Sequence, residues 1–197
     1  AREKESNISR EIFEMPELCP VCGGIVLRDK DEAAYRCTNN DCPAKSFRGL
    51  VHFTSKDAMN IEGLGPAVLK VLFDIGLVTD ISDIYRLSEH RDELINLERM
   101  GEKSVDNLLT SIENTKNNEL YRLIFGPGIR QIGAATSKTM AKHFGSMDAV
   151  MQADCVTLEN LEDFGRITAD SVREFFTESK YIALVNELKE LGLNMTY

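Results

Sequence analysis

The chain has 197 residues and a formal net charge of −9, a length that suits one large domain or two small ones. No stretch approaches the ~18 consecutive apolar residues of a membrane-spanning helix, and the first residues do not form a signal peptide. Composition therefore argues against an integral membrane protein and against a secreted one. We expect a cytoplasmic protein with no membrane partner.

Residues 1–18 are strongly charged and contain Pro16, which is unfavourable inside a helix. The chain also begins without an initiator methionine. We expect this stretch to be the tail of an upstream domain or a linker, and the chain to be a piece of a longer protein.

Four of the five cysteines are clustered, with two short-spaced pairs separated by the length of a hairpin: Cys19, Cys22, Cys37 and Cys42. Four thiolates in this spacing can form the tetrahedral shell of a structural zinc, and such a closed shell leaves no position for a catalytic water. Iron is the alternative metal. We predict a four-cysteine finger over residues 19–48, with short strands near 25–27 and 34–36. A segment this short cannot build a hydrophobic core. Metal binding must therefore supply its folding energy.

The rest of the chain, residues 49–197, repeats one pattern. Four glycines recur at spacings of 36, 32 and 32 residues, and apolar side chains stand one and four residues before them. Further matched positions lie three and seven residues after each glycine, and a period of this kind indicates a repeated supersecondary unit. We predict a mostly α fold of four tandem helix-hairpin-helix motifs. Their turns are expected near residues 63–65, 99–101, 131–133 and 163–165.

Three further helical segments are expected around the repeats. Residues 48–60 should form a helical link into the first motif, residues 82–87 a connecting helix, and residues 181–191 a helix that caps the stack. Cys155 has no nearby partner in sequence, and we expect it to be a buried structural thiol. His52 lies beyond the finger, and we expect it to be packed or solvated and not a metal ligand.

The chemistry of the repeated turn points to a phosphate. Glycine permits a sharp turn with φ > 0 and removes the Cβ that would keep a ligand away. The following helix begins with unpaired N–H groups and the positive end of its dipole, where an anion can bind. Candidate DNA-binding residues are Gly63, Gly65, Gly101, Lys103, Ser104, Arg130, Gly133, Thr136, Lys138, Gly165 and Thr168. Such backbone contacts bind DNA without reading its sequence.

The acidity of the repeats favours a second hypothesis. Residues 56–197 carry 15 Lys and Arg against 23 Asp and Glu, whereas nucleic-acid binders are usually basic. The repeats are therefore either a DNA-backbone module that relies on main-chain donors and a few local cations, or a protein–protein interaction module. The cluster Lys45, Arg48 and Lys56 either meets phosphates or balances nearby acids.

Several local motifs resemble the C-terminal portion of bacterial NAD-dependent DNA ligases. They are Pro16-x-x-Cys19-Pro20-x-Cys22-Gly23, His52-Phe53-x-Ser55-x-x-Ala58-Met59-x-Ile61-x-Gly63-Leu64-Gly65, Leu97-Glu98-Arg99-Met100-Gly101-x-Lys103-Ser104 and Gly128-Ile129-Arg130-x-Ile132-Gly133. The resemblance covers residues 16–197. It departs at Ala67, where the family often has lysine, and at Pro127, where it usually has leucine; the first departure suggests that the first hairpin is more structural than DNA-gripping.

The resemblance implies a module of a ligase that seals nicks in double-stranded DNA during replication and repair. The family's upstream adenylation and oligonucleotide-binding domains would then be further partners in the same polypeptide, with NAD and Mg²⁺ acting only in those missing catalytic domains. The adenylated Lys-x-Asp-Gly motif is absent from this sequence. The chain is accordingly expected to be inactive alone, with a mainly structural zinc, hairpins on the minor-groove side of the duplex, and a location at the bacterial nucleoid.

Overall fold

A computed structural model describes residues 15–28 and 34–197 and divides the chain after Lys45 into two units. Most of the leading segment expected over residues 1–18 lies outside the described residues. Each unit is described separately below. Among the described residues, no helix has both the length and the apolar character that crossing a bilayer requires.

The first unit is a small β-ribbon. Strand β1 (Val26–Arg28) pairs antiparallel with β2 (Tyr35–Cys37), with Val26 opposite Cys37, and an isolated bridge joins Leu18 to Ile25. The two strands lie one residue further along the chain than expected. The large apolar side chains of this unit are mostly solvent-exposed, with Leu18, Val21, Ile25 and Leu27 all 57–59% exposed. The described part of this unit therefore has no hydrophobic core.

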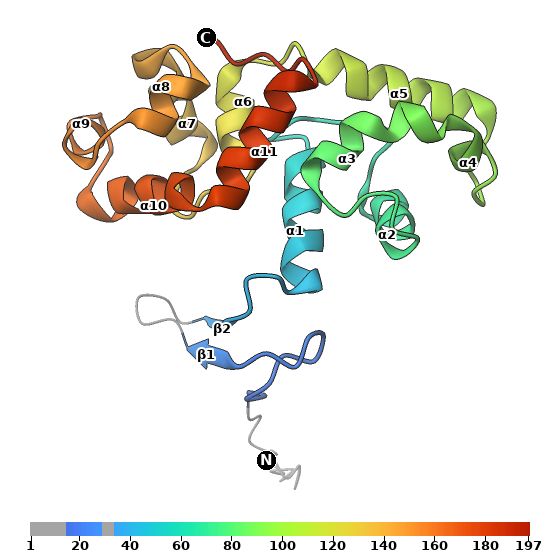
Figure 1. Cartoon of the computed structure of the whole chain (residues 1–197), viewed down its shortest axis with the longest axis horizontal. Helices are drawn as coiled ribbons and strands as arrows, with labels where there is room; N and C mark the ends of the chain where they lie inside the picture. The colour runs from blue at the N-terminus through green and yellow to red at the C-terminus, as the bar shows by residue number, and fades with distance from the viewer. Residues whose placement is uncertain (1–14, 29–33) are drawn as a thin grey trace, which may run out of the picture. The chain divides into compact units, whose positions relative to one another are not determined.

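The second unit is helical apart from an isolated bridge between Ser146 and Thr196 (Figure 1). Its elements are α1 (Pro43–Thr54, which begins in the first unit), α2 (Pro66–Asp74), α3 (Ile81–Arg86), the 3₁₀ helix η1 (Leu87–His90), α4 (Arg91–Ile95), α5 (Glu102–Thr115), α6 (Leu120–Phe125), α7 (Ala134–Phe144), α8 (Met147–Gln152), α9 (Cys155–Glu159), α10 (Arg166–Thr177) and α11 (Ser179–Glu190). The mostly α prediction, with short strands only in the finger, is confirmed.

The helical link expected over residues 48–60 is shifted toward the N-terminus. Helix α1 starts at Pro43, a residue suited to the first turn of a helix, and ends at Thr54. A turn then carries the chain to Asn60, which has a left-handed φ of 54°. The connecting helix and the C-terminal helix are found within one or two residues of their expected bounds, as α3 and α11.

All four predicted hairpins share one backbone geometry. In each, the N–H of the residue before the repeated glycine donates to the C=O three residues earlier, at 3.1–3.3 Å. The residue two before the glycine is left-handed, with φ between 62° and 86°: Gly63, Arg99, Gln131 and Asp163. We name these turns the first (residues 61–65), second (97–101), third (129–133) and fourth (161–165) hairpins.

The repeated glycines themselves correct the expectation of φ > 0. Gly65, Gly101, Gly133 and Gly165 are extended, with φ from −119° to −74° and ψ from 164° to 176°. Each is the N-cap of the following helix, a position that normally has extended backbone. The sharp bend has already been made two residues earlier, so glycine is not needed here for its backbone freedom.

The side chains that each hairpin buries stand at fixed distances from the repeated glycine. The positions three residues after the glycines, Val68, Ser104, Thr136 and Thr168, are half-buried or exposed. The positions four and seven residues after the glycines are fully buried: Leu69, Val105, Ser137, Ala169, Leu72, Leu108, Met140 and Val172. Because the helix starts one residue after the glycine, it is the i+4 and i+7 side chains that face the core.

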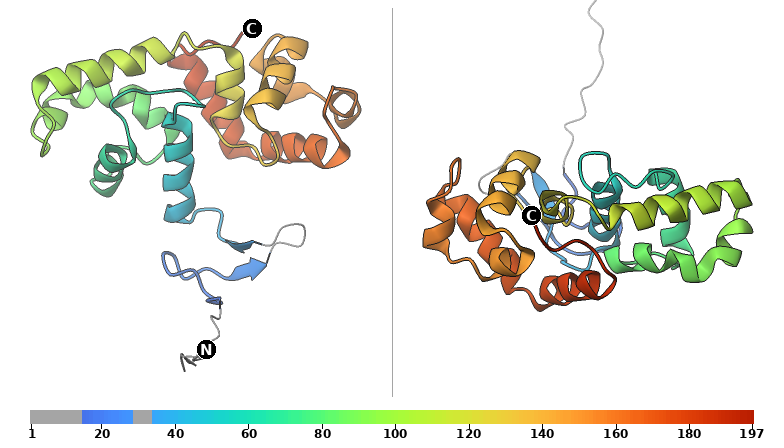
Figure 2. Two further views of the ribbon diagram at one scale, coloured as in Figure 1. Left: turned by 180° about the vertical axis from the view of Figure 1, so that it is seen from behind. Right: turned by 90° about the horizontal axis from the view of Figure 1, so that it is seen from above.

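Helix α11 joins the earlier hairpins to the later ones. It contacts both α3 and α10, and in both views α2–α5 lie on one side of it and α7–α10 on the other (Figures 1 and 2). Arg86 of α3 donates to Glu187 of α11 at 2.7 Å, and this guanidinium holds the pKa of Glu187 below its ordinary value. The N–H of Asn194 donates to the C=O of Lys116 at 2.7 Å.

We predict that Ser137→Ala stabilises the helical unit. Ser137 is fully buried, and its hydroxyl has no hydrogen-bond partner in the part of the chain that the structure describes. Removing this hydroxyl should therefore raise the free energy of unfolding by about 1 kcal/mol. Thr115 is the matched control: its buried hydroxyl donates to Ile112 O at 2.7 Å and lies 3.3 Å from Tyr85 Oη. Thr115→Val should therefore lower the same quantity in urea unfolding. A loss of stability in Ser137→Ala would contradict this assignment.

Candidate metal centre and nucleic-acid interface

The four clustered cysteines converge on one point. Their Sγ atoms all lie within 4.8 Å of one another, with 3.9 Å between Cys19 and Cys42 and 3.5 Å between Cys22 and Cys37. Thiolates at ~2.3 Å from a tetrahedral zinc would be about 3.8 Å apart. A disulfide would need about 2.05 Å. The geometry and the donor set fit a closed, structural zinc site.

Two short turns place these ligands. In the first, Cys19 N–H donates to Gly24 O at 2.7 Å and Gly23 N–H donates to Cys19 O at 2.8 Å, with Gly23 left-handed at φ 69°. In the second, Asp41 N–H donates to the side chain of Asn39 at 2.9 Å. The β1–β2 pairing then brings the two turns to the same end of the ribbon.

Gly24 is required by close packing at the thiols. A Cβ there would lie 3.0 Å from Asn39 Cβ, 3.2 Å from Cys37 Sγ and 3.3 Å from Cys22 Sγ. This role of Gly24 was not identified from the sequence. The signal was the glycine pair directly after a cysteine.

The surrounding protein shifts the pKa values of these thiols in opposite directions. A hydrogen bond from the backbone N–H of Gly24 lowers the pKa of Cys22 to about 6, whereas burial raises the pKa of Cys37 to about 11. The backbone N–H of Val21 also lowers the pKa of Cys19. Thiolates are the metal ligands, so metal binding must displace the protons that remain.

The remaining cysteine and His52 lie outside this cluster. His52 Nε2 is 3.1 Å from Phe125 O, and its ring packs edge-on against Phe125 at 4.6 Å between centroids. It is thus a packing residue, as expected. Cys155 is only half-buried, with its Sγ 3.9 Å from Asp170 Oδ1. The expectation of a buried thiol is wrong, because Cys155 begins the short, largely exposed helix α9.

The four repeated glycines are all exposed at the surface. A Cβ at Gly65, Gly101, Gly133 or Gly165 would meet no described protein atom within 4 Å. At each, no side chain of the described residues caps the helix that follows. The N–H groups of the first two residues of α5, α7 and α10 are therefore open to an external acceptor. Ser104 N–H already donates to Gly101 O at 2.9 Å, and α2 lacks one such donor because of Pro66.

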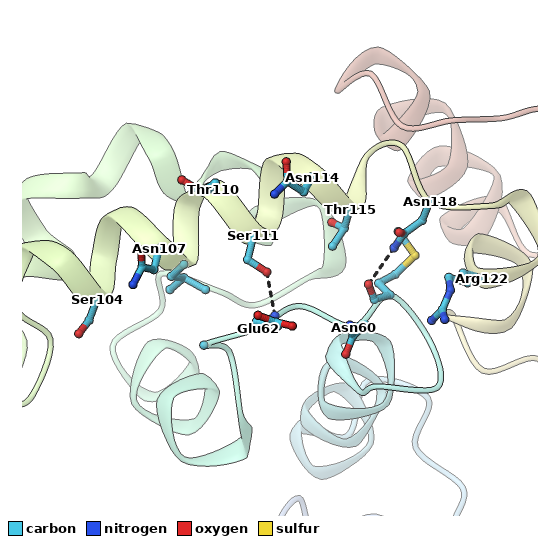
Figure 3. A pocket seen from close by; sticks show the side chains of 13 residues that line it. Asn60, Glu62, Ser104, Asn107, Thr110, Ser111, Asn114, Thr115, Asn118 and Arg122 are labelled. Carbon is cyan, nitrogen blue, oxygen red and sulfur yellow. Dashed lines mark hydrogen bonds between the residues drawn. The ribbon is translucent and has the colours of Figure 1, made fainter.

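The first hairpin is fastened to helix α5. Glu62 N–H donates to Ser111 Oγ at 2.8 Å, and Gly63 lies so close that a Cβ there would be 3.6 Å from Leu108 Cβ (Figure 3). Gly63, one of the candidate DNA-binding residues, is exposed, and its backbone lies against Leu108 of α5 on one side. This packing agrees with the expectation, drawn from Ala67, that the first hairpin is mainly structural.

The candidate side chains are distributed unequally among the other hairpins. Lys103 and Ser104 are exposed at the start of α5, and Arg130 is exposed in the third hairpin. Lys138 Nζ lies 4.7 Å from the ring centroid of Tyr121, so its ammonium packs against α6. Thr136 and Thr168 are half-buried at the starts of α7 and α10.

Charge separates the third hairpin from its neighbours. Residues 120–147 contain four cations and no carboxylate: Arg122, Arg130, Lys138 and Lys142. The second hairpin carries Glu98 and Glu102 beside its turn, and the fourth carries Glu162, Asp163 and Asp170. In the fourth, Arg166 is 3.7 Å from Asp170. Lys142 was not among the candidate residues, although the acid-free stretch is visible in the sequence.

Models of known protein families match the cysteine finger and the hairpin regions of this chain. Residues 19–44 match the NAD-dependent DNA ligase C4 zinc finger domain, residues 55–114 a SAM-like helix-hairpin-helix tandem, and residues 122–185 a helix-hairpin-helix motif. The chain is 48% identical to a DNA ligase of Acetivibrio thermocellus over 98% of its length, and 50% identical to one of Symbiobacterium thermophilum over 91%. It is 51% identical to a Bacillus pumilus DNA ligase over 94%. The matched regions are 27–29% of those relatives, so the chain spans less than a third of their length.

We predict that a chelator unfolds the finger and leaves the helices. The described finger has no apolar core, whereas the helical unit has an extensive one, so only the finger depends on metal for its folding energy. Chelation should remove the chemical-shift dispersion of the NMR signals of the β-ribbon. It should preserve most of the helical circular dichroism. Zinc re-addition is the control. Loss of all helical signal would instead mean that the two units fold cooperatively.

Proposed function

The chain belongs to the family of NAD-dependent DNA ligases, and we propose that it binds the phosphate backbone of duplex DNA without reading the base sequence. The observation that carries this proposal is the repeated helix start. Exposed, extended glycines precede α2, α5, α7 and α10; among the described residues no side chain caps these helices and no atom lies within 4 Å of where a Cβ would stand. Such helix starts accept anions through main-chain N–H groups and the helix dipole.

The third hairpin is the strongest phosphate contact in this proposal. It combines the open start of α7 with the acid-free stretch that contains Arg130 and Lys142. Carboxylates beside the second and fourth turns oppose a phosphate there, and the first hairpin is packed on α5. The overall negative charge is then compatible with DNA binding, because net charge governs long-range attraction and not the local site.

The proposed role in a complete ligase is to hold a nicked duplex while other domains of the same polypeptide seal it. Those domains, an adenylation domain and an oligonucleotide-binding domain, would use NAD and Mg²⁺. Replication and repair, in the bacterial cytoplasm at the nucleoid, are the processes that supply such nicks. The DNA-facing residues proposed here are Gly101, Lys103, Ser104, Arg130, Gly133, Thr136, Lys138, Lys142, Gly165 and Thr168.

Zinc has a structural part in this proposal. Cys19, Cys22, Cys37 and Cys42 would hold it and use every position of a tetrahedral shell. The finger would thereby gain the folding energy that its exposed apolar side chains do not provide.

A protein–protein interaction module is the second candidate, and the fourth hairpin favours it. Val156 of α9 and Ile167 of α10, which flank this hairpin in sequence, are 70% and 72% exposed. The carboxylates Glu162, Asp163 and Asp170 lie in the same stretch of the chain. Exposed apolar side chains rimmed by charge occur at protein contacts. This candidate predicts a stable protein complex whose affinity does not depend on DNA.

We expect this chain to bind a nicked duplex with an affinity that falls steeply as salt rises. Each neutralised phosphate contributes a slope of about −0.9 to the plot of log affinity against log salt. Fluorescence anisotropy with nicked and intact duplexes of two unrelated sequences, at several salt concentrations, measures both the slope and the lack of sequence dependence. No complex at low salt, or a complex indifferent to salt, would overturn the DNA proposal.

A matched pair of substitutions tests the role of the third hairpin. Gly133 and Gly165 are both extended N-caps with open space beside them, so valine should be tolerated in the fold at either position. Gly133→Val should weaken duplex binding about tenfold, because its side chain blocks the approach of a phosphate. Gly165→Val should change affinity much less.

Circular dichroism and thermal unfolding serve as the folding control for both variants. Equal losses of affinity in the two folded variants would show that the hairpins contribute alike. Unchanged affinity in Gly133→Val would remove the third hairpin from the interface.

A further inference from the structure

The helical unit contains a groove that shares only Ser104 with the proposed DNA contacts. It has a volume of about 740 Å³ and lies between the segment 59–63 and one face of α5 (Figure 3). This volume is within the range of ligand-binding clefts. Apart from Glu62 and Arg122, its lining carries no charged side chain.

One face of α5 is a row of uncharged hydrogen-bonding side chains. We name it the polar stripe: Ser104, Asn107, Ser111, Asn114 and Asn118, which continues just beyond the helix end. Spacings of three and four residues put these side chains on the same face. Elsewhere α5 exposes charged groups, including Lys103, Asp106 and Glu113, so the neutrality of the stripe is particular to the groove.

Some members of the stripe hold the opposite wall in place. Ser111 Oγ accepts from Glu62 N–H at 2.8 Å, and Asn118 Nδ2 donates to Met59 O at 2.8 Å. Arg122, at the same end as Asn118, donates to Lys56 O at 3.1 Å. These bonds fix the segment 59–63 across from α5, and the groove is therefore a built feature of the fold.

The side-chain amides of the two other asparagines of the stripe are available to bind a ligand. No hydrogen bond joins the side chain of Asn107 or Asn114 to any part of the chain that the structure describes, and both line the groove. They stand seven residues apart, or two helical turns, which is ~10.5 Å along the axis. Each amide offers a donor pair and an acceptor in one plane, the complement of a peptide unit.

We propose that this groove binds an extended polypeptide segment through its main chain. An extended chain rises ~3.3 Å per residue, so Asn107 and Asn114 are placed to meet peptide units about three residues apart. Glu62 lies beneath Ser111 and Arg122 lies toward Asn118 (Figure 3). A partner segment with one basic and one acidic side chain would complement these two charges.

The lining favours a polypeptide over a nucleic-acid strand. Single strands bind through grooves that are positively charged and carry aromatic side chains for base stacking. This groove has one cation balanced by one carboxylate, and no aromatic residue lines it. Phosphates therefore gain no net attraction, whereas neutral peptide units find matching donors and acceptors.

NMR titration of the ¹⁵N-labelled, zinc-loaded chain tests the proposal without DNA. The probe is the capped peptide acetyl-Ala-Lys-Ala-Ser-Glu-amide at millimolar concentration. It should shift the side-chain amide signals of Asn107 and Asn114. Asn107→Ala and Asn114→Ala should each weaken its binding about fivefold, the loss expected for one hydrogen bond. Asn117→Ala, an exposed neighbour outside the groove, is the matched control and should bind as the parent does.

Two further titrations decide what the groove recognises. The same peptide with a fully N-methylated backbone should produce no shifts, because its main-chain donors are gone. A thymidine oligonucleotide should leave the two asparagine signals unchanged. The proposal is overturned if the capped peptide shifts neither signal, if the N-methylated peptide binds equally well, or if the oligonucleotide shifts the same signals at lower concentration.

Discussion

The hairpins depend on one main-chain hydrogen bond, made four times. The N–H of the residue before each repeated glycine donates to the C=O three residues earlier and holds a left-handed residue between them. Because the backbone alone closes the turn, the left-handed position tolerates Gly63, Arg99, Gln131 and Asp163. The next helix then starts directly after an exposed glycine, and a Cβ at that glycine would meet no described atom within 4 Å. Under the proposed function, main-chain geometry would supply the anion site, and side chains would only strengthen or weaken it.

The four turns share one backbone geometry but differ in the charged residues and the packing around them. The third hairpin lies in an acid-free stretch, the second and fourth carry carboxylates at their turns, and the first is fastened to α5 through Ser111 and Leu108. Under the proposed function, one hairpin would dominate phosphate binding. The bond between Glu62 and Ser111 also fixes one wall of the polar groove, so the contact that holds the first hairpin on α5 also shapes a second surface.

The two units are stabilised by different means. The helical unit buries apolar side chains four and seven residues after each glycine, and the Arg86–Glu187 pair joins α3 to α11. The finger leaves Leu18, Ile25 and Leu27 largely exposed and buries chiefly Cys19 and Cys42. Its order rests on four thiols within 4.8 Å and on Gly24, whose missing Cβ lets Cys22 and Cys37 approach.

The sequence by itself determined the helical class, the four turns and the cysteine cluster, because periodic glycines and paired cysteines are local patterns. It did not determine the backbone role of Gly65, Gly101, Gly133 and Gly165, since the left-handed bend falls on residues of varied type two positions earlier. Only the tertiary structure decided that Gly63 packs on α5, that Cys155 is half-buried and that the polar stripe faces a groove. These features come from contacts between residues distant in the chain, such as Glu62 with Ser111, and no local pattern specifies which faces of two helices will meet.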